Sequence, residues 1–351
     1  MSLRSIFWDD GLKLIDQTKL PEKLEVIECR NVEELADAIK KLAVRGAPAL
    51  EAAGAYGIAL AAREREFADV DELKEHLKKA ADFLASTRPT AVNLFVGIER
   101  ALNAALKGES VEEVKELALR EAEKLAEEDV ERNRKMGEYG AELLEDGDVV
   151  LTYCNAGRLA TVDWGTALGV VRSAVEQGKE IRVIACETRP LNQGSRLTCW
   201  ELMEDGIDVT LITDSMVGIV MQKGMVDKVI VGADRIVRDA VFNKIGTYTV
   251  SVVAKHHNIP FYVAAPKATF DWERTAKDVV IEERPREELI FCGKRQIAPL
   301  NVKVYNPAFD PTPLENVTAL ITEYGVIYPP YEVNVPKVLK FEGGSHHHHH
   351  H

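Results

Sequence analysis

The sequence has little histidine outside its last six positions. We interpret residues 343–351 as a linker and a hexahistidine tag, which leaves His76, His256 and His257 out of nine histidines. These three lie in helix-like stretches and have no second ligand at a suitable spacing. The sequence therefore predicts no metal site, and we expect no cofactor.

Three other absences narrow the class of protein. The five cysteines show no CxxC spacing, and no signal-like or long apolar segment is present. The net charge is −13, and lysine and arginine form no basic run. We therefore expect a cytoplasmic protein that binds neither nucleic acid nor membrane.

The first third of the chain has the pattern of a helical domain. Apolar residues recur every three or four positions over residues 73–84 and 111–125, which is typical of amphipathic helices. Short alternating segments at residues 7–15 and 23–29 predict a small antiparallel sheet. We expect residues 1–130 to form a mainly helical N-terminal domain that includes this sheet.

The pattern changes after residue 146, where short apolar runs alternate with helical stretches. Such runs suit buried strands of a parallel sheet, and stretches of helical length between them suit crossover connections. We therefore expect residues 131–342 to form a Rossmann-like α/β domain with a doubly wound parallel sheet. The predicted strands are residues 149–153, 181–186, 209–212, 228–232 and 261–265, and the predicted helices are residues 164–176, 193–204, 215–222 and 247–256.

Ligands of an open parallel sheet bind at the carboxyl ends of its strands, so the residues that follow each strand are the candidates. Cys154 follows the first predicted strand, and a helix start after it favours a reactive thiolate. The alternative is a small buried apolar residue, which is the commoner role of cysteine.

Polar residues also follow the second and third predicted strands. Glu187–Pro190 and Asn192–Arg196 precede a helix and could bind a sugar or a phosphate, although an N-cap with an exposed loop has the same composition. Asp214 follows the third strand, and there we expect only a helix cap.

The fourth predicted strand ends before Asp234, whose carboxyl group could act as a general acid. A simple ion pair with Arg235 is the alternative. Asn243 and Lys244 lie shortly before a helix, where they could hold hydroxyl and phosphate groups. A lysine in such a loop is more often solvated.

Two arginines of the helical region stand beside helix starts. One is Arg45, which precedes Gly46 and Ala47, and the other is Arg88 in the segment 87–94. Arginine suits bidentate recognition of phosphate, but an arginine before a helix is equally often part of a surface ion pair.

Taken together, these motifs resemble the methylthioribose-1-phosphate isomerase family, over about residues 8–331. Each motif is weak alone, but seven in this order are specific. They are Arg45–Pro48, Thr87–Leu94, Cys154–Gly157, Glu187–Pro190, Gln193–Gly194, Gly232–Arg235 and Asn243–Thr247.

The resemblance implies an aldose–ketose isomerase that converts 5-methylthioribose 1-phosphate to 5-methylthioribulose 1-phosphate in methionine salvage. It implies that Cys154 and Asp234 are the catalytic residues. The implied substrate-binding residues are Arg45, Gly46, Ala47, Arg88, Gln193, Asn243 and Lys244.

The same family group leaves other functions open. Relatives isomerise ribose 1,5-bisphosphate, and 5-deoxyribose 1-phosphate is a further possible substrate. Others are the non-catalytic α, β and δ regulatory subunits of translation initiation factor 2B, so the fold alone does not imply catalysis. The resemblance also implies a homodimer.

Overall fold

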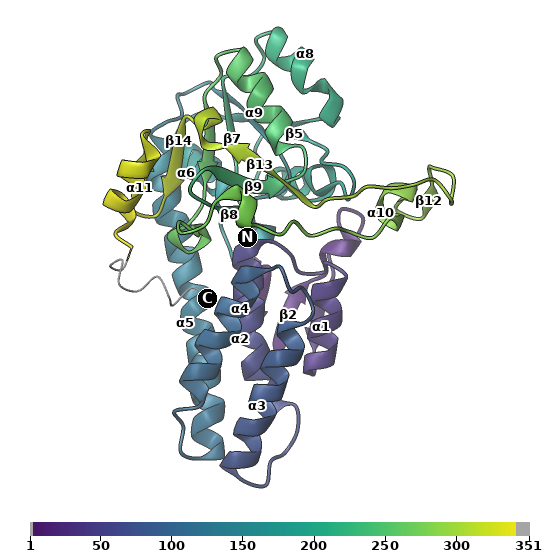
Figure 1. Ribbon diagram of the computed structural model, residues 1–351, viewed down its shortest axis with the longest axis vertical. Coiled ribbons are helices and arrows are strands. Elements are labelled where there is room, and N and C mark those ends of the chain that lie inside the picture. Colours follow the sequence, from purple (N-terminus) through teal and green to yellow (C-terminus); the bar gives the residue numbers. More distant parts are fainter. Residues whose placement is uncertain (1–2, 342–351) are drawn as a thin grey trace. The chain divides into compact units, whose positions relative to one another are not determined.

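The computed structural model describes residues 3–341 and divides into two compact units (Figure 1). Unit 1 comprises the residues up to Asn133 together with Ala156–Gly165. Unit 2 comprises Arg134–Asn155 and the residues from Thr166 onward. The predicted linker and tag at residues 343–351 lie outside the described residues. The structure places the segment Ala156–Gly165 in unit 1, although it follows the first strand of the parallel sheet.

Unit 1 begins with a small antiparallel sheet of three strands in the order β1-β2-β3. Ile6 pairs with Leu14, and Leu12 pairs with Cys29. These four side chains are buried, so one face of the sheet contributes to the core of unit 1. This agrees with the sheet predicted from the sequence. The strands are β1 (Ile6–Trp8), β2 (Leu12–Ile15) and β3 (Val26–Cys29).

Helices make up the rest of unit 1. Asn31 and Asp69 are the N-caps of α1 and α3, and their side chains accept hydrogen bonds from the amides of Glu34 and Glu72. α2 and α4 pack so closely that a Cβ atom on Gly97 would lie only 1.9 Å from the carbonyl oxygen of Glu51, and glycine is therefore required there. The helices are α1 (Val32–Lys40), α2 (Ala47–Arg63), α3 (Val70–Ala85), α4 (Val92–Ala105) and α5 (Val111–Ala141), and α5 continues into unit 2.

Unit 2 is built on a seven-stranded sheet in the order β15-β14-β10-β7-β4-β5-β6. All neighbouring strands are parallel except β15, which pairs antiparallel with β14. Fully buried apolar side chains such as Leu151, Val229 and Val263 form its core. The strands are β4 (Val149–Thr152), β5 (Arg182–Cys186), β6 (Val209–Ile212), β7 (Lys228–Val231), β10 (Phe261–Ala264), β14 (Ala319–Thr322) and β15 (Gly325–Ile327).

The helices of unit 2 follow the predicted alternation with strands, with one difference. The predicted helix over residues 193–204 is a π-helical turn at Gly194–Thr198 that continues into α7. The α-helices are α6 (Ala167–Glu176), α7 (Cys199–Glu204), α8 (Val217–Gln222), α9 (Thr247–His256) and α11 (Tyr331–Leu339). The prediction of an α/β fold with a helical region and a mainly parallel sheet is confirmed.

Unit 2 also contains elements that the sequence patterns did not predict. A second sheet has the order β13-β9-β8, with β8 (Arg235–Ile236), β9 (Ala240–Lys244) and β13 (Phe309–Pro313). Asn243 and Lys244 therefore end a strand, whereas the sequence predicted a loop. A short helix α10 (Glu287–Ile290) precedes the hairpin of β11 (Phe291–Cys292) and β12 (Arg295–Gln296), which extends from unit 2 in Figure 1.

No helix between residues 3 and 341 combines the length and the apolar character that a membrane span requires.

Candidate active site

Three neighbouring strands of unit 2 carry the main candidate residues at their carboxyl ends. Cys154 follows β4, Thr188 follows β5, and Asp234 follows β7. β4 pairs with both β5 and β7, so the loop of Cys154 stands between the other two. The prediction that Cys154 and Asp234 follow parallel strands is confirmed.

The backbone of Cys154 adopts a left-handed conformation, with a φ angle of 64°. Its amide donates a hydrogen bond of 2.7 Å to Oγ1 of Thr188, and its carbonyl accepts one of 2.8 Å from Oγ1 of Thr198. The residue is 8% exposed. A residue with a side chain costs energy in this conformation, and glycine would serve if only a turn were needed. This geometry favours the functional interpretation of Cys154 over that of a mere apolar filler.

The loop after β5 is held by Asp214, which was expected only to cap a helix. The carboxylate of Asp214 accepts hydrogen bonds of 2.8 Å from the amide of Thr188 and 2.7 Å from the amide of Arg189. Thr188 is fully buried and left-handed, with a φ angle of 67°. The signal that could have revealed this role is the position of Asp214 directly after β6, the neighbour of β5.

Tyr153 is a second residue that the sequence analysis missed. Its hydroxyl donates a hydrogen bond of 2.8 Å to the carbonyl oxygen of Ile245 and lies 3.4 Å from Oδ2 of Asp214. Burial raises the pKa of the Tyr153 phenol, and the nearby Asp214 carboxylate raises it further, so the hydroxyl stays a donor. Tyr153 therefore joins the Cys154 loop to the turn after β9.

Asn243 and Lys244 are the last two residues of β9, directly before that turn. Asn243 is buried, and its Nδ2 donates a hydrogen bond of 3.0 Å to Oγ1 of Thr247. The ammonium group of Lys244 lies 4.8 Å from the centre of the Phe309 ring. Lys244 is half-buried, which argues against a fully solvated lysine.

Asp310 fixes the start of the helix that follows. Its carboxylate accepts hydrogen bonds of 2.8 Å from the amide of Gly246 and 3.2 Å from the amide of Tyr248. Burial raises the pKa of Asp310 to about 6, although these two amides act in the opposite direction. Asp310 thus anchors the backbone next to Lys244.

Two adjacent amide oxygens lie buried before the π-helical turn. Within residues 3–341, neither Oε1 of Gln193 nor Oδ1 of Asn192 has a hydrogen-bond partner. Gln193 is only 4% exposed, and an unsatisfied buried acceptor is costly. The next residue, Gly194, lies so close to β5 that a Cβ atom would be 1.7 Å from the carbonyl oxygen of Cys186. Hydroxyl groups of a ligand would satisfy these two acceptors.

Asp234 adjoins the second sheet of unit 2. Its amide donates a hydrogen bond of 2.8 Å to the carbonyl oxygen of Phe242 in β9. The alternative of a simple ion pair with Arg235 is not supported, because the guanidinium of Arg235 pairs with Asp271 at 3.8 Å.

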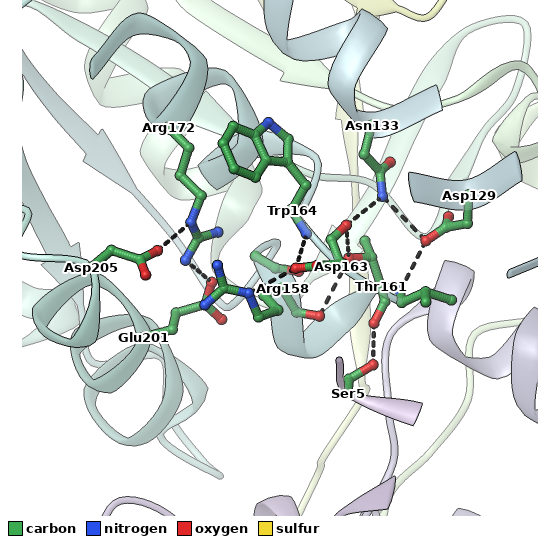
Figure 2. A network of polar contacts seen from close by, with 12 residues as sticks. Ser5, Asp129, Asn133, Arg158, Thr161, Asp163, Trp164, Arg172, Glu201 and Asp205 are labelled. Atoms are coloured by element: carbon green, nitrogen blue, oxygen red, sulfur yellow. Dashed lines mark hydrogen bonds and ion pairs between the residues drawn. The ribbon is translucent and has the colours of Figure 1, made fainter. Parts of the chain in front are cut away.

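A buried network supports Asn155, the residue next to Cys154 in unit 2. Nδ2 of Asn155 donates hydrogen bonds of 3.0 Å to Glu201 and 3.1 Å to Thr198. Arg172 in turn donates to Glu201 at 2.9 Å and to Asp205 at 2.6 Å, as Figure 2 shows. Ion pairs of this kind, with both partners hydrogen-bonded, hold a loop in one geometry.

The remaining predicted residues belong to unit 1. Arg45 is 9% exposed, and its Nη1 donates a hydrogen bond of 3.4 Å to Oε1 of Gln17. Its burial argues against a surface ion pair. Gly46 has a φ angle of 93°, and a Cβ atom there would lie 2.5 Å from the carbonyl oxygen of Ala160. Ala47 is the first residue of α2, and Arg88 lies half-buried in the turn between α3 and α4.

The segment that packs against Gly46 is itself fixed within unit 1 (Figure 2). Asn133 donates hydrogen bonds of 3.2 Å to Asp129 and 3.0 Å to the carbonyl oxygen of Asp163. Arg158 pairs with the carboxylate of Asp163 at 2.8 Å. Burial raises the pKa of Asp129, against the opposing effects of Arg132 and its hydrogen bonds.

Comparison with known proteins shows similarity along nearly the whole chain. The initiation factor 2 subunit family matches residues 43–329. A methylthioribose-1-phosphate isomerase from Thermosipho melanesiensis is 56% identical over 94% of this chain and 96% of its own. A crystal structure of 5-methylthioribose 1-phosphate isomerase from Pyrococcus horikoshii matches with a TM-score of 0.91 and 44% identity, over 97% of this chain and 96% of that chain. A translation initiation factor eIF-2B from Pyrococcus horikoshii matches with a TM-score of 0.67 and 28% identity, over 86% and 98% of the two chains.

Proposed function

The chain belongs to the initiation factor 2 subunit family, and from this premise we propose that it converts 5-methylthioribose 1-phosphate to 5-methylthioribulose 1-phosphate. The resemblance to methylthioribose-1-phosphate isomerases that the motifs predicted is confirmed by the identity to relatives with that name. The protein is therefore an aldose–ketose isomerase of methionine salvage.

The observation that carries this proposal is the place of Cys154 and Asp234 in the sheet. The chain runs outward from β4 to β6 and then returns to β7 on the other side of β4. This reversal supports a doubly wound, Rossmann-like sheet, in which ligands bind where the strand order reverses. Cys154 and Asp234 follow the two strands that flank that point.

The substrate poses a problem that two such residues can solve. A phosphate on the anomeric oxygen prevents the spontaneous ring opening of ordinary aldoses, so the enzyme has to break the bond between C1 and the ring oxygen. Asp234 in its protonated form donates its proton to the ring oxygen as that bond breaks. The hydrogen on C2 then moves to C1, and the 2-hydroxyl group loses its proton to become the ketone.

Cys154 acts at the hydrogen transfer, and two routes fit its position. As a thiolate it removes the C2 proton, and the resulting enediol is protonated at C1. In the other route the hydrogen moves as a hydride from C2 to C1, and Cys154 only shapes the surroundings. Solvent deuterium enters the product in the first route alone.

The phosphate and the hydroxyl groups need their own partners. Lys244 supplies positive charge for the phosphate from unit 2. For Arg45, Arg88, Gly46 and Ala47 in unit 1, the substrate-binding role stays the prediction of the family resemblance.

The buried amide groups are suited to binding the hydroxyl groups of the sugar. Oε1 of Gln193 is an acceptor without a partner among the described residues, and a sugar hydroxyl would supply its hydrogen. Asn243 offers a second amide group for the same purpose. This need for hydroxyl donors supports a sugar as the ligand.

The protein also acts in the cytoplasm as a homodimer under this proposal. Leu211 on the edge strand β6 is 51% exposed and Ile219 on α8 is 47% exposed, which suits a contact between two copies. Light scattering of the purified protein tests this point, and a monomeric mass at micromolar concentration contradicts it.

The test of the activity is a panel of three substrates followed by proton NMR in heavy water. We expect turnover of 5-methylthioribose 1-phosphate to exceed that of 5-deoxyribose 1-phosphate and of ribose 1,5-bisphosphate. Turnover of the bisphosphate alone contradicts the proposed substrate. Absence of turnover with all three, together with binding to translation initiation factor 2, supports a regulatory subunit instead.

A further inference from the structure

The carboxylate of Asp214 links the loop that follows β6 to the loop that follows β5 by hydrogen bonds. It follows β6 and accepts hydrogen bonds from the consecutive amides of Thr188 and Arg189, which follow β5, at 2.8 and 2.7 Å. Each of its two oxygens accepts one of these bonds. Bonds from amides to a carboxylate are stronger than those to a neutral acceptor. The first turn after β5 is thus fixed from the neighbouring strand.

The turn that Asp214 holds is in direct contact with Cys154. Oγ1 of Thr188 accepts a hydrogen bond of 2.7 Å from the amide of Cys154 and lies 3.1 Å from the carbonyl oxygen of Cys186, to which it donates. Thr188 and Cys154 are both left-handed, with φ angles of 67° and 64°. Such a conformation is an outlier for a β-branched residue and persists only when its surroundings enforce it. The two amide bonds to Asp214 supply that enforcement.

From this chain of contacts we propose that Asp214 is a positioning residue for the isomerase reaction, because it orients the backbone of Cys154 through Thr188. This role deepens the proposed function and rests on it. Asp214 itself does not touch the substrate in this account. Its effect reaches the reacting atoms only through the direction in which Cys154 presents its thiol.

A carboxylate is the group that this role requires. An asparagine has one acceptor oxygen, and its amide nitrogen would face a backbone N–H, so Asp214→Asn keeps at most one of the two bonds. Thr188→Val preserves the branched shape but leaves the buried amide of Cys154 without its acceptor. Thr188→Ser retains the hydroxyl and serves as the conservative rescue.

Asp227 provides a matched control at the opposite end of β4. Its Oδ2 accepts a hydrogen bond of 2.8 Å from the amide of Val149, so Asp227→Asn also removes a carboxylate that holds a backbone amide. Asp227 precedes β7 and so lies at the amino ends of the strands, away from Cys154. A general loosening of the protein would affect the Asp227 and Asp214 variants alike.

The experiment combines steady-state kinetics with alkylation of cysteines by iodoacetamide, followed by mass spectrometry of each cysteine peptide. In Asp214→Asn and Thr188→Val we expect kcat to fall about 10- to 100-fold with little change in KM, as a displacement of about 1 Å can cause. We also expect faster alkylation of Cys154, because a released loop exposes its thiol. Cys186, which is fully buried in β5, should stay protected. Thr188→Ser and Asp227→Asn should behave as the wild type does.

The alkylation measurement needs no substrate, so it separates this proposal from the proposed function. Wild-type protein that turns over none of the sugar phosphates overturns the function, while a selective change at Cys154 still supports the link from Asp214. Unchanged alkylation of Cys154 in both variants overturns the positioning role, whatever happens to kcat. If Asp214→Asn does not fold, the comparison of Thr188→Val with Thr188→Ser decides the question.

Discussion

At the amino edge of the parallel sheet in unit 2, three of the turns from helix to strand are made by glycine. Gly178, Gly206 and Gly224 have φ angles of 90°, 70° and 69°, and a Cβ atom on any of them would meet nothing within 4 Å. A fourth turn uses Asn258, which tolerates a left-handed backbone better than most residues. These glycines serve the backbone alone.

At the carboxyl edge, three left-handed positions are held by residues with side chains. Cys154, Thr188 and Asn192 have φ angles of 64°, 67° and 59°. Cys154 is the proposed catalytic thiol, Thr188 accepts the Cys154 amide, and Asn192 lies 3.5 Å from Cys292 through its Nδ2. Strain of this kind is retained at functional sites because the surrounding structure enforces it. The difference between the edges therefore marks where function requires a side chain in place of a glycine.

The largest expected effect is at the proposed catalytic pair. Asp234→Asn removes the proton donor, and loss of a general acid typically lowers the rate by about 10² to 10⁴. We expect a similar loss for Cys154→Ser, with both variants as stable as the wild type. The measurement is kcat with 5-methylthioribose 1-phosphate, beside urea denaturation. Unimpaired turnover of Asp234→Asn would end its assignment as the acid.

A large effect on stability is expected at Gly194, whose backbone lies against the end of β5. Gly194→Ala places a methyl group 1.7 Å from the carbonyl oxygen of Cys186, so the backbone has to move. Overpacking of this kind costs about 1–3 kcal/mol of unfolding free energy, and activity should fall because Gln193 moves too. Urea denaturation measures the first and kcat/KM the second. A variant with wild-type stability and activity would show that this contact is not tight.

A smaller effect is expected at the amino edge. Gly206→Ala meets open space, so only the left-handed backbone is penalised, by about 1 kcal/mol. Its kcat and KM should equal those of the wild type, since this turn lies at the end of the strands away from Cys154. Urea denaturation and steady-state kinetics check both statements. A marked loss of activity would remove the distinction between the two edges.

The effect at Asp310 is confined to the pH dependence of stability. Burial raises its pKa in the folded protein to about 6, whereas an unfolded aspartate has a pKa of about 4. The folded state therefore holds the proton more tightly, and the stability contributed by this group falls as the pH rises from about 4 to 6.

Asp310→Asn removes this titration, so the stability of the variant relative to the wild type should rise over that pH range. Urea denaturation of both proteins at pH 4, 5, 6 and 7 provides the measurement. A constant difference between them would contradict the raised pKa.

The sequence predicted five of the seven strands of the main sheet, because these five are short, mainly apolar and separated by helices of sufficient length, whereas β14 and β15 were not predicted. Strands such as β6 and β7 lie within one residue of their predicted bounds. The second sheet was not predicted, since β8 has only two residues and β9 pairs with β13, which lies far along the chain. Asn243 and Lys244 were placed in a loop for that reason.

The candidate site was predictable where it depended on position after a strand. Cys154 and Asp234 stand where the strand pattern placed them, and their chemical roles stay predictions. Asp214 and Tyr153 were missed because their importance lies in hydrogen bonds between loops that are far apart in sequence. The position of Asp214 after β6 is the one signal of its role in the sequence, and a buried tyrosine gives none.

The most direct test of the account is a crystal structure of the Cys154→Ser variant with 5-methylthioribose 1-phosphate bound. We predict the Asp234 carboxyl group within about 3 Å of the ring oxygen, the side chain of residue 154 beside C1 and C2, and a sugar hydroxyl on Oε1 of Gln193. A sugar phosphate bound away from the carboxyl ends of β4 and β7 would contradict the proposed site and the mechanism built on it.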